Sequence, residues 1–178
     1  MSAGKAYALR LSSPIGGLLL SCDDAGLTGL WMEGARYAPA SLPDAGDGRN
    51  HPVMTQTRRW LDAYFSGRQP DFTPPLHLSG TPFRMAVWAQ LLDIPYGQTT
   101  TYASIARHIA AQRGTAHLSA QAVGGAVGHN PVSLIVPCHR VLGTNGSLTG
   151  YAGGLEKKAW LLALERKGSQ GVLQPSAP

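Results

Sequence analysis

Residues 119–140 read SAQAVGGAVGHNPVSLIVPCHR, and this stretch decides how the second half of the chain is interpreted. Ser119 is a favoured helix N-cap residue. Val123, Ala126 and Val127 then follow at the spacing of one helix face. The sequence therefore predicts a short helix that begins directly after Ser119.

The predicted helix is unusual because it contains Gly124, Gly125 and Gly128. Each glycine costs a helix about 1 kcal/mol relative to alanine. Two interpretations stay open: tight packing against a neighbouring helix, or close approach of the helix backbone to a DNA groove. The helix lacks the long polar side chains that read bases in the major groove. If it binds DNA, we expect a minor-groove contact with little sequence preference.

The apolar run VSLIV predicts a short buried strand that leads to Pro137-Cys138-His139-Arg140. An inert buried Cys138 beside a surface His139 is one interpretation of this pattern. Two features favour a reactive thiol instead. The segment follows the glycine-bearing helix, and it precedes a long glycine-rich loop, VLGTNGSLTGYAGGL, which suits a pocket wall.

Two further helices precede this region. Thr81 as N-cap and Pro82 at the first position begin one of them, with Phe83, Val87, Leu91 and Ile94 as its expected buried face. The next has Tyr102, Ile105, Ala106, Ile109 and Ala110 at helical spacing. Together with the helix after Ser119, this predicts a helix-turn-helix.

The last predicted helix is LEKKAWLLALERKG, for which we expect Leu155, Ala159, Leu162 and Ala163 to face inward. Glu165 stands at the edge of this apolar face. The spacing leaves open whether Glu165 is solvated or lies against His139.

The first third of the chain predicts a small antiparallel sheet, with strands at AYALRL, GLLLSC and LTGLWM. Residues 34–52 are expected to form a loop. A helix follows in VMTQTRRWLDAYFSG, with a buried stripe made of Val53, Thr57, Trp60, Leu61, Tyr64 and Phe65. The segment QPDFTPPLHLSG is the expected linker. We predict an N-terminal domain over 1–79, a second domain over 80–168 and a disordered tail over 169–178.

Charge and cysteine content restrict the functional class. The net charge of +5 lies entirely in residues 80–178, which hold 8 basic and 3 acidic residues. This bias favours a polyanion as partner. Cys22 and Cys138 lack metal or redox spacing and predict free thiols in a reducing compartment. No apolar run is long enough for a membrane span or a signal peptide, so we expect a cytoplasmic protein.

The stretch from Gln121 to Glu165 closely resembles the O6-alkylguanine-DNA alkyltransferases, or methylated-DNA–protein-cysteine methyltransferases. The PCHR box within NPxxxxxPCHRV carries the resemblance, and TPFRMAVWAQLLDIPYGQTTTYASIA extends it upstream. SPIGGLLLSCDDAGLTGLWMEG and LDAYFSG match more loosely. The resemblance implies an α+β protein with a ribonuclease H-like N-terminal sheet and a mostly helical C-terminal domain, acting as a monomer without a cofactor.

The resemblance also implies residue roles. Cys138 would accept the alkyl group, and His139, held by Glu165, would take the thiol proton through a water. Asn130 would brace the turn before the active-site strand, and Tyr102 would assist departure of the base. The implied substrate pocket contains Val127, Val136, Tyr151, Gly153 and Lys158. The implied DNA contacts are Ala120, Gln121, Ala122, Gly124, Arg140 and Arg113.

The implied activity is repair of double-stranded DNA. An alkyl group passes from O6-alkylguanine to Cys138, and the thioether product has no easy leaving group, so each molecule works once. The base must be rotated out of the duplex, at a cost of a few kcal/mol. Activity on O4-alkylthymine and the range of alkyl groups are left open.

Two departures from the family pattern bear on this expectation. Gln121 stands where relatives often have an arginine that fills the gap left by the flipped base, so we expect weaker DNA binding; Arg113 is expected to compensate by reaching a phosphate. Some relatives hold zinc in the N-terminal domain through cysteines and histidines. Cys22 is the only cysteine there, so we predict no metal.

Three other functions are compatible with parts of this pattern. An alkyltransferase-like protein that only flags lesions lacks the acceptor cysteine, whereas Cys138 is present. A cysteine hydrolase would need oxyanion donors and turnover. A DNA-packaging protein would need far more charge than +5.

Overall fold

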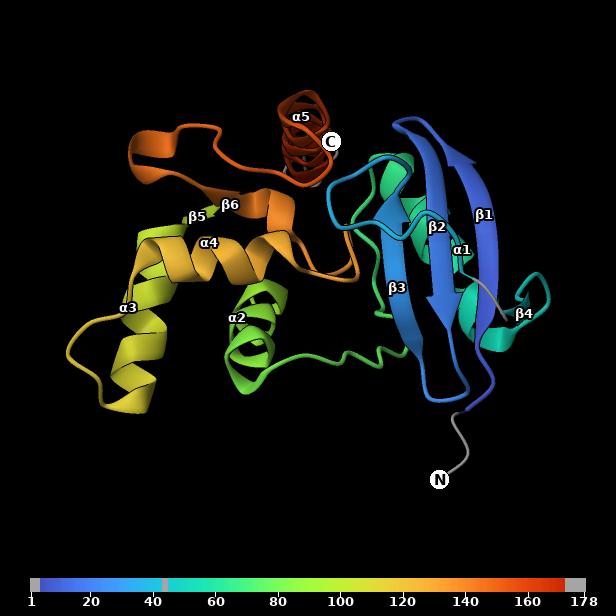
Figure 1. The fold of residues 1–178 in the computed structure, drawn as a ribbon. Helices are drawn as coiled ribbons and strands as arrows, with labels where there is room; N and C mark the ends of the chain where they lie inside the picture. Colours follow the sequence, from blue (N-terminus) through green and yellow to red (C-terminus); the bar gives the residue numbers. More distant parts are fainter. Residues whose placement is uncertain (1–3, 43–44, 172–178) are drawn as a thin grey trace. The chain divides into compact units, whose positions relative to one another are not determined.

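The computed structural model describes residues 4–42 and 45–171 (Figure 1). The chain divides into two compact units. The first runs to Ser79 and also includes Pro131–Ser133, while the second contains Gly80–Asn130 and the chain from Leu134 onward. The return of Pro131–Ser133 to the first unit was not anticipated from the sequence.

The first unit is built on a four-stranded sheet of order β3-β2-β1-β4. The predicted strands are confirmed as β1 (Tyr7–Ser13), β2 (Gly16–Cys22) and β3 (Leu27–Met32), which pair antiparallel in sequence order. The fourth, β4 (Gly46–Asp47), lies in the segment expected to be a loop and pairs parallel with β1. Two residues are too few to show an alternating pattern, so this pairing had no sequence signal.

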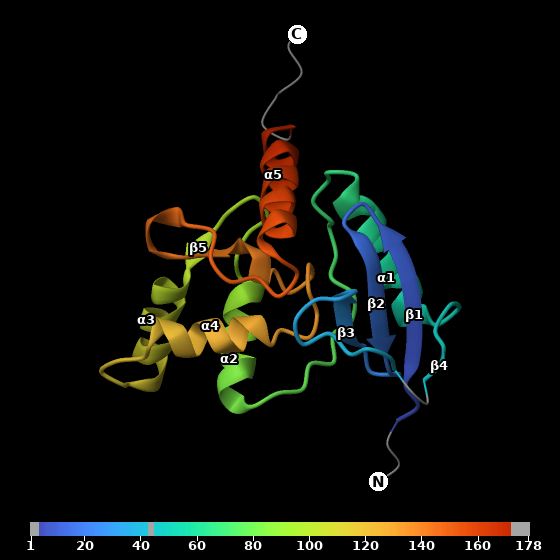
Figure 2. The same ribbon diagram turned by 45° about the horizontal axis from the view of Figure 1, so that its top comes forward.

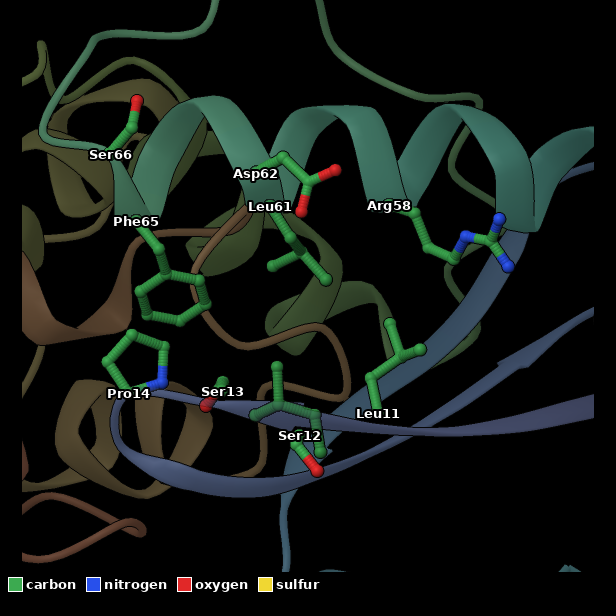
Figure 3. Close-up of a pocket in the computed structure, with 10 residues that line it drawn as sticks. Leu11, Ser12, Ser13, Pro14, Arg58, Leu61, Asp62, Phe65 and Ser66 are labelled. Atoms are coloured by element: carbon green, nitrogen blue, oxygen red, sulfur yellow. The ribbon is translucent and has the colours of Figure 1, made fainter.

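Helix α1 (Pro52–Phe65) covers one face of this sheet (Figure 2). His51 caps it, because its side chain accepts a hydrogen bond from the Val53 amide. The predicted stripe is buried except at Phe65, and Met54 joins it. Between α1 and the β1–β2 hairpin lies a pocket of about 540 Å³, into which Phe65 and Leu61 point (Figure 3).

The expected linker is part of the first unit rather than a free connection. Leu27 donates to the Pro75 carbonyl at 2.7 Å, and His77 donates to the Leu27 carbonyl at 2.9 Å. Gly26 permits this close approach, because a Cβ there would lie 2.8 Å from the Pro75 backbone.

The second unit is centred on three helices: α2 (Pro82–Leu92), α3 (Tyr102–Arg113) and α4 (Ala120–Gly128). Helix α4 lies across α2 and α3 in Figure 1. The predicted caps are confirmed: Thr81 accepts from the Arg84 amide, and Ser119 accepts from the Ala122 amide. The buried faces are also largely as predicted, although Phe83 is only half-buried.

The remaining elements connect to the reactive segment. β5 (Thr100–Thr101) pairs parallel with β6 (Val141–Leu142), and a short 3-10 turn spans Cys138–Arg140. Helix α5 (Leu155–Gly171) ends the described chain. Residues 169–171 are therefore helical rather than disordered, and 172–178 lie outside the described residues. In the part of the chain described, no helix has the length and apolar character needed to cross a membrane.

The Ser119 cap gives a first testable prediction. Helix α4 contains three glycines and only nine residues, so it depends on its cap more than most helices do. Replacing Ser119 with alanine is expected to lower the free energy of unfolding by about 1 kcal/mol. Ser119→Asp keeps an accepting oxygen and serves as the control. Urea unfolding of both variants measures the effect, and an unchanged midpoint for Ser119→Ala would contradict it.

Candidate active site

Cys138 begins the 3-10 turn, and its residue is 5% exposed. The strand predicted before it does not form. Leu134 has φ of 71°, in the left-handed region, so the chain turns there instead of extending. Val132 alone makes a β-bridge, to Leu30. Cys138 is thus held by a turn, with Pro137 before it.

The environment of the thiol both disfavours and supports its ionised form. Burial raises the pKa of Cys138, while the Asn130 side chain and the charge of Lys158 offset part of that effect. Asn130 is itself buried and donates a hydrogen bond from Nδ2 to the Val136 carbonyl at 2.8 Å. Asn130 therefore fixes the turn that leads to Cys138. The Val136 carbonyl also accepts a hydrogen bond from the Cys138 backbone amide at 2.8 Å, which uses its second lone pair.

His139 and Glu165 form a fully buried pair, 2.6 Å apart between Nε2 and Oε1. The sequence spacing had left this contact open. Burial tends to raise the pKa of Glu165, but hydrogen bonds and charges from His139 and Arg140 more than offset this and hold it at about 2. The carboxylate is ionised at neutral pH and can only accept, so Nε2 carries the hydrogen.

Arg140 differs most from its expected position. It was expected at the DNA surface, yet the residue is 7% exposed and its guanidinium faces inward. It donates to both oxygens of Glu165, from Nε to Oε2 at 2.8 Å and from Nη2 to Oε1 at 2.9 Å. A third bond runs from Nη1 to the Ile94 carbonyl at 2.7 Å. The guanidinium is thus engaged inside the second unit.

The loop after α2 completes this buried network. Gly97 donates its backbone amide to Oε2 of Glu165 at 3.1 Å, and the Tyr96 ring lies 5.7 Å from the Arg140 guanidinium carbon. Sequence reasoning missed both residues. The available signal was the Pro95-Tyr96-Gly97 turn, in which Gly97 adopts φ of 76°.

Lys158 is a buried ammonium beside the glycine-rich loop. It donates to the Val141 carbonyl at 2.6 Å and to the Thr149 carbonyl at 3.0 Å. Burial lowers its pKa to about 8, against an opposing effect from Cys138. The Tyr102 hydroxyl donates to the same Thr149 carbonyl at 3.1 Å, so both side chains hold this loop.

Two tyrosines flank the Lys158 ammonium, with ring centres 5.8 Å (Tyr102) and 5.9 Å (Tyr151) away. Burial raises the pKa of Tyr102 to about 12 and that of Tyr151 well above its ordinary value. Both hydroxyls are therefore neutral at physiological pH. Gly153, also expected in the pocket, is half-buried in the loop before α5.

The buried face of α5 was wrongly predicted. Leu155, Ala159 and Ala163 are exposed, and the helix instead buries Lys158, Leu161 and Glu165. The apolar pattern gave the wrong face because Lys158 and Glu165 form hydrogen bonds with segments that are distant in the chain. Burial of a charge becomes tolerable once it is paired and hydrogen-bonded.

Three of the residues expected to bind DNA lie together at the surface. Ala120, Gln121 and Ala122 are exposed in the first turn of α4. A Cβ at Gly125 would meet no atom within 4 Å, and one at Gly124 would make only an ordinary 3.9 Å contact with Tyr102. Tight packing therefore does not explain these two glycines. Val127, which was expected in the substrate pocket, is buried, and the Arg113 guanidinium carbon lies 5.4 Å from the Phe83 ring.

Comparison with known proteins shows the family. Residues 82–167 match the model for the 6-O-methylguanine DNA methyltransferase DNA-binding domain, and residues 6–78 match that for its ribonuclease-like domain. A methylated-DNA–protein-cysteine methyltransferase of Mycolicibacterium paratuberculosis is 44% identical over 92% of this chain and 94% of its own. The inducible enzyme of Bacillus subtilis is 44% identical over 77% of this chain and 72% of its own.

Solved structures agree with the sequence matches. The O6-methylguanine methyltransferase of Mycobacterium tuberculosis is similar with a TM-score of 0.78 and 39% identity, covering 97% of this chain and 96% of that one. The M. tuberculosis protein in complex with DNA gives a TM-score of 0.76 and 42% identity over 91% and 94% of the two chains. The chain therefore belongs to the methylated-DNA–protein-cysteine methyltransferases, a family of DNA repair enzymes with a DNA-binding domain.

Proposed function

We propose that this protein transfers the alkyl group of O6-alkylguanine in double-stranded DNA to Cys138, in a reaction that each molecule performs once. One observation carries the proposal: the thiol of Cys138 stands next in the chain to an imidazole that a buried carboxylate orients at 2.6 Å. Family membership supplies the substrate class.

The thiol proton passes to His139. Because Nε2 of the imidazole carries the hydrogen bound to Glu165, the lone pair of the neutral ring lies on Nδ1. Burial lowers the pKa of His139, so the neutral ring dominates at pH 7. Nδ1 then takes the proton of Cys138 through a water, and a thiolate forms beside the Lys158 ammonium.

The thiolate attacks the alkyl carbon in line with the bond to the guanine oxygen. The sulfur–carbon bond forms, the carbon–oxygen bond breaks, and its electron pair remains on the base. The proton that His139 took from Cys138 passes to the base, so guanine leaves as a neutral molecule. Tyr102 keeps its hydroxyl hydrogen at its raised pKa of about 12 and is suited to donate a hydrogen bond to the departing base.

The reaction consumes the protein because the thioether of Cys138 has no good leaving group. A hydrolase with the same three residues would release product and recycle. Stoichiometry therefore separates the two activities.

DNA binding is assigned to the exposed first turn of α4. Ala120, Gln121 and Ala122 offer small or neutral side chains, and the open surface at Gly125 permits backbone approach. This favours a minor-groove contact led by the backbone, with little sequence preference. The reacting base must leave the stack, because its O6 atom lies at the major-groove edge, whereas the proposed contact is in the minor groove and the Cys138 thiol is buried.

A titration tests the proposal. Increasing amounts of a duplex with one O6-methylguanine are added to a fixed amount of protein, and intact mass is measured after completion. We expect one methyl group per protein molecule, located on the Cys138 peptide, and no gain for Cys138→Ser. Transfer beyond one equivalent would indicate turnover, and no gain in the wild type would support a protein that only flags lesions.

Gln121 allows a direct test of the proposed DNA contact. Replacing it with arginine adds a cation at the exposed start of α4, so affinity for an unmodified duplex is expected to rise about tenfold at low salt. Gln90→Arg on α2 adds the same charge elsewhere in the second unit and is the control. Fluorescence anisotropy measures both, and equal gains would assign the effect to net charge alone.

A further inference from the structure

The buried contact of Arg140 with Glu165 points to a role in the reaction that neither the sequence nor the family membership assigned. Both oxygens of Glu165 receive hydrogen bonds from Arg140, while Oε1 also receives the bond from His139. All three side chains are buried. The carboxylate that orients the imidazole is therefore already paired with a permanent cation.

This pairing affects which form of the imidazole is stable. A buried carboxylate alone beside a histidine favours the imidazolium, because the opposite charges attract strongly away from water. Burial of the ring is the largest effect that lowers the pKa of His139, and the Arg140 charge acts in the same direction. The guanidinium offsets part of the attraction from Glu165 and repels a second positive charge.

The charge on His139 matters because an imidazole that is already protonated cannot accept the proton of Cys138. Resting on the proposed function, we propose that Arg140 is a positioning residue that neutralises Glu165 and so keeps His139 uncharged until Cys138 gives up its proton. Arg140 touches neither the base nor DNA in this role. It also ties the Ile94 carbonyl to the same buried centre at 2.7 Å, which holds the guanidinium in register with the carboxylate.

Other ionisable groups near His139 do not replace Arg140. The Lys158 charge also disfavours the imidazolium, but that ammonium is bound to loop carbonyls and not to Glu165. Burial raises the pKa of Cys138, Tyr96 and Tyr151, so these groups are neutral near pH 7. Arg140 is thus the cation in hydrogen-bond contact with the carboxylate.

The pH dependence of alkyl transfer tests the role. Single-turnover rates are measured from pH 5 to pH 9 for the wild type, Arg140→Gln, Arg140→Lys and the double variant Arg140→Gln/Glu165→Gln. For Arg140→Gln the acid limb is expected to move up by about one pH unit, giving about a tenfold lower rate on that limb and recovery at higher pH. Arg140→Lys restores the cation and the double variant removes the anion. The acid limb of each of these two variants is therefore expected to return toward its wild-type position.

A purely structural role predicts something different. It would lower the rate of Arg140→Gln equally at every pH and would not be rescued by the double variant. Binding to an unmodified duplex provides a second contrast, since we expect Arg140→Gln to bind within about twofold of the wild type. A large loss of affinity with an unmoved acid limb would overturn the proposal in favour of a phosphate contact.

One measurement depends neither on the folding of an Arg140 variant nor on enzyme activity. Nitrogen-15 NMR of wild-type histidines, with the His139 signal assigned by its loss in His139→Gln, reports ring charge and tautomer. We expect a neutral ring with its hydrogen on Nε2 at pH 7. An imidazolium at pH 7 would overturn the proposal about Arg140, whereas a wild type that takes up no alkyl group would instead defeat the proposed function.

Discussion

Replacing His139 with glutamine is expected to lower the rate of alkyl transfer to Cys138 by about 10²–10⁴-fold at pH 7, the range typical of a lost general base. Glutamine keeps a donor for Glu165 but has no site that accepts the thiol proton. Burial raises the pKa of Cys138, so few molecules would carry a thiolate without that acceptor. Single-turnover mass spectrometry with an O6-methylguanine duplex measures the rate.

The matching control is His77→Gln. His77 belongs to the first unit, where its ring nitrogen contacts Asp23 at 2.6 Å. This variant is expected to transfer the alkyl group at the wild-type rate. If His139→Gln also reacted within threefold of the wild type, the thiol proton would have to leave by another route.

Replacing Glu165 with alanine is expected to have the largest effect on stability, about 3–5 kcal/mol. The substitution leaves the Arg140 guanidinium buried and without the carboxylate that it contacts through two bonds. Glu156 lies on the same helix but is exposed, so Glu156→Ala is expected to change stability by less than about 0.5 kcal/mol. Chemical denaturation at pH 7 compares the two variants.

Acid should remove from the wild type the stabilisation that the Glu165 carboxylate provides. The pKa of Glu165 is lowered from 4.5 to about 2 in the folded protein. The stabilisation is therefore fully present above pH 4.5 and is lost as the pH falls through about 2. The difference between wild type and Glu165→Ala should shrink over that interval. A constant difference would show that the carboxylate charge does not contribute.

Local rules predicted most of the fold. Thr81 and Ser119 cap α2 and α4 as their side chains suggested, and the strand-like runs AYALRL, GLLLSC and LTGLWM predicted β1, β2 and β3. These features depend on neighbours within a few positions along the chain, so one sequence suffices to find them. The two-residue strands β4, β5 and β6 depend on partners far away in the chain and left no local pattern.

The site shows the same difference between features that local sequence predicts and contacts that only the structure brings together. Cys138 and His139 stand out as neighbours in the sequence, whereas Glu165 is 26 positions from His139 and met it only in the structure. The prediction of the buried face of α5 was wrong for the same reason. The spacing of apolar residues cannot show that Lys158 and Glu165 are buried with distant partners. Arg140 was expected at the DNA surface because the resemblance implied a DNA contact, and its carboxylate partner lies 25 positions away in the chain.

The burial of Arg140 and Lys158 also reduces the number of cations that the second unit can present to a polyanion. The second unit has eight basic residues, and these two are enclosed, which leaves six cations that are not buried. Each phosphate neutralised by a cation releases condensed counterions, and six such contacts give a slope of about −5 for log affinity against log salt. The electrostatic contribution of the second unit to DNA binding is thus smaller than its composition suggests. On the proposed function, a larger share of lesion recognition would fall to contacts with the flipped base.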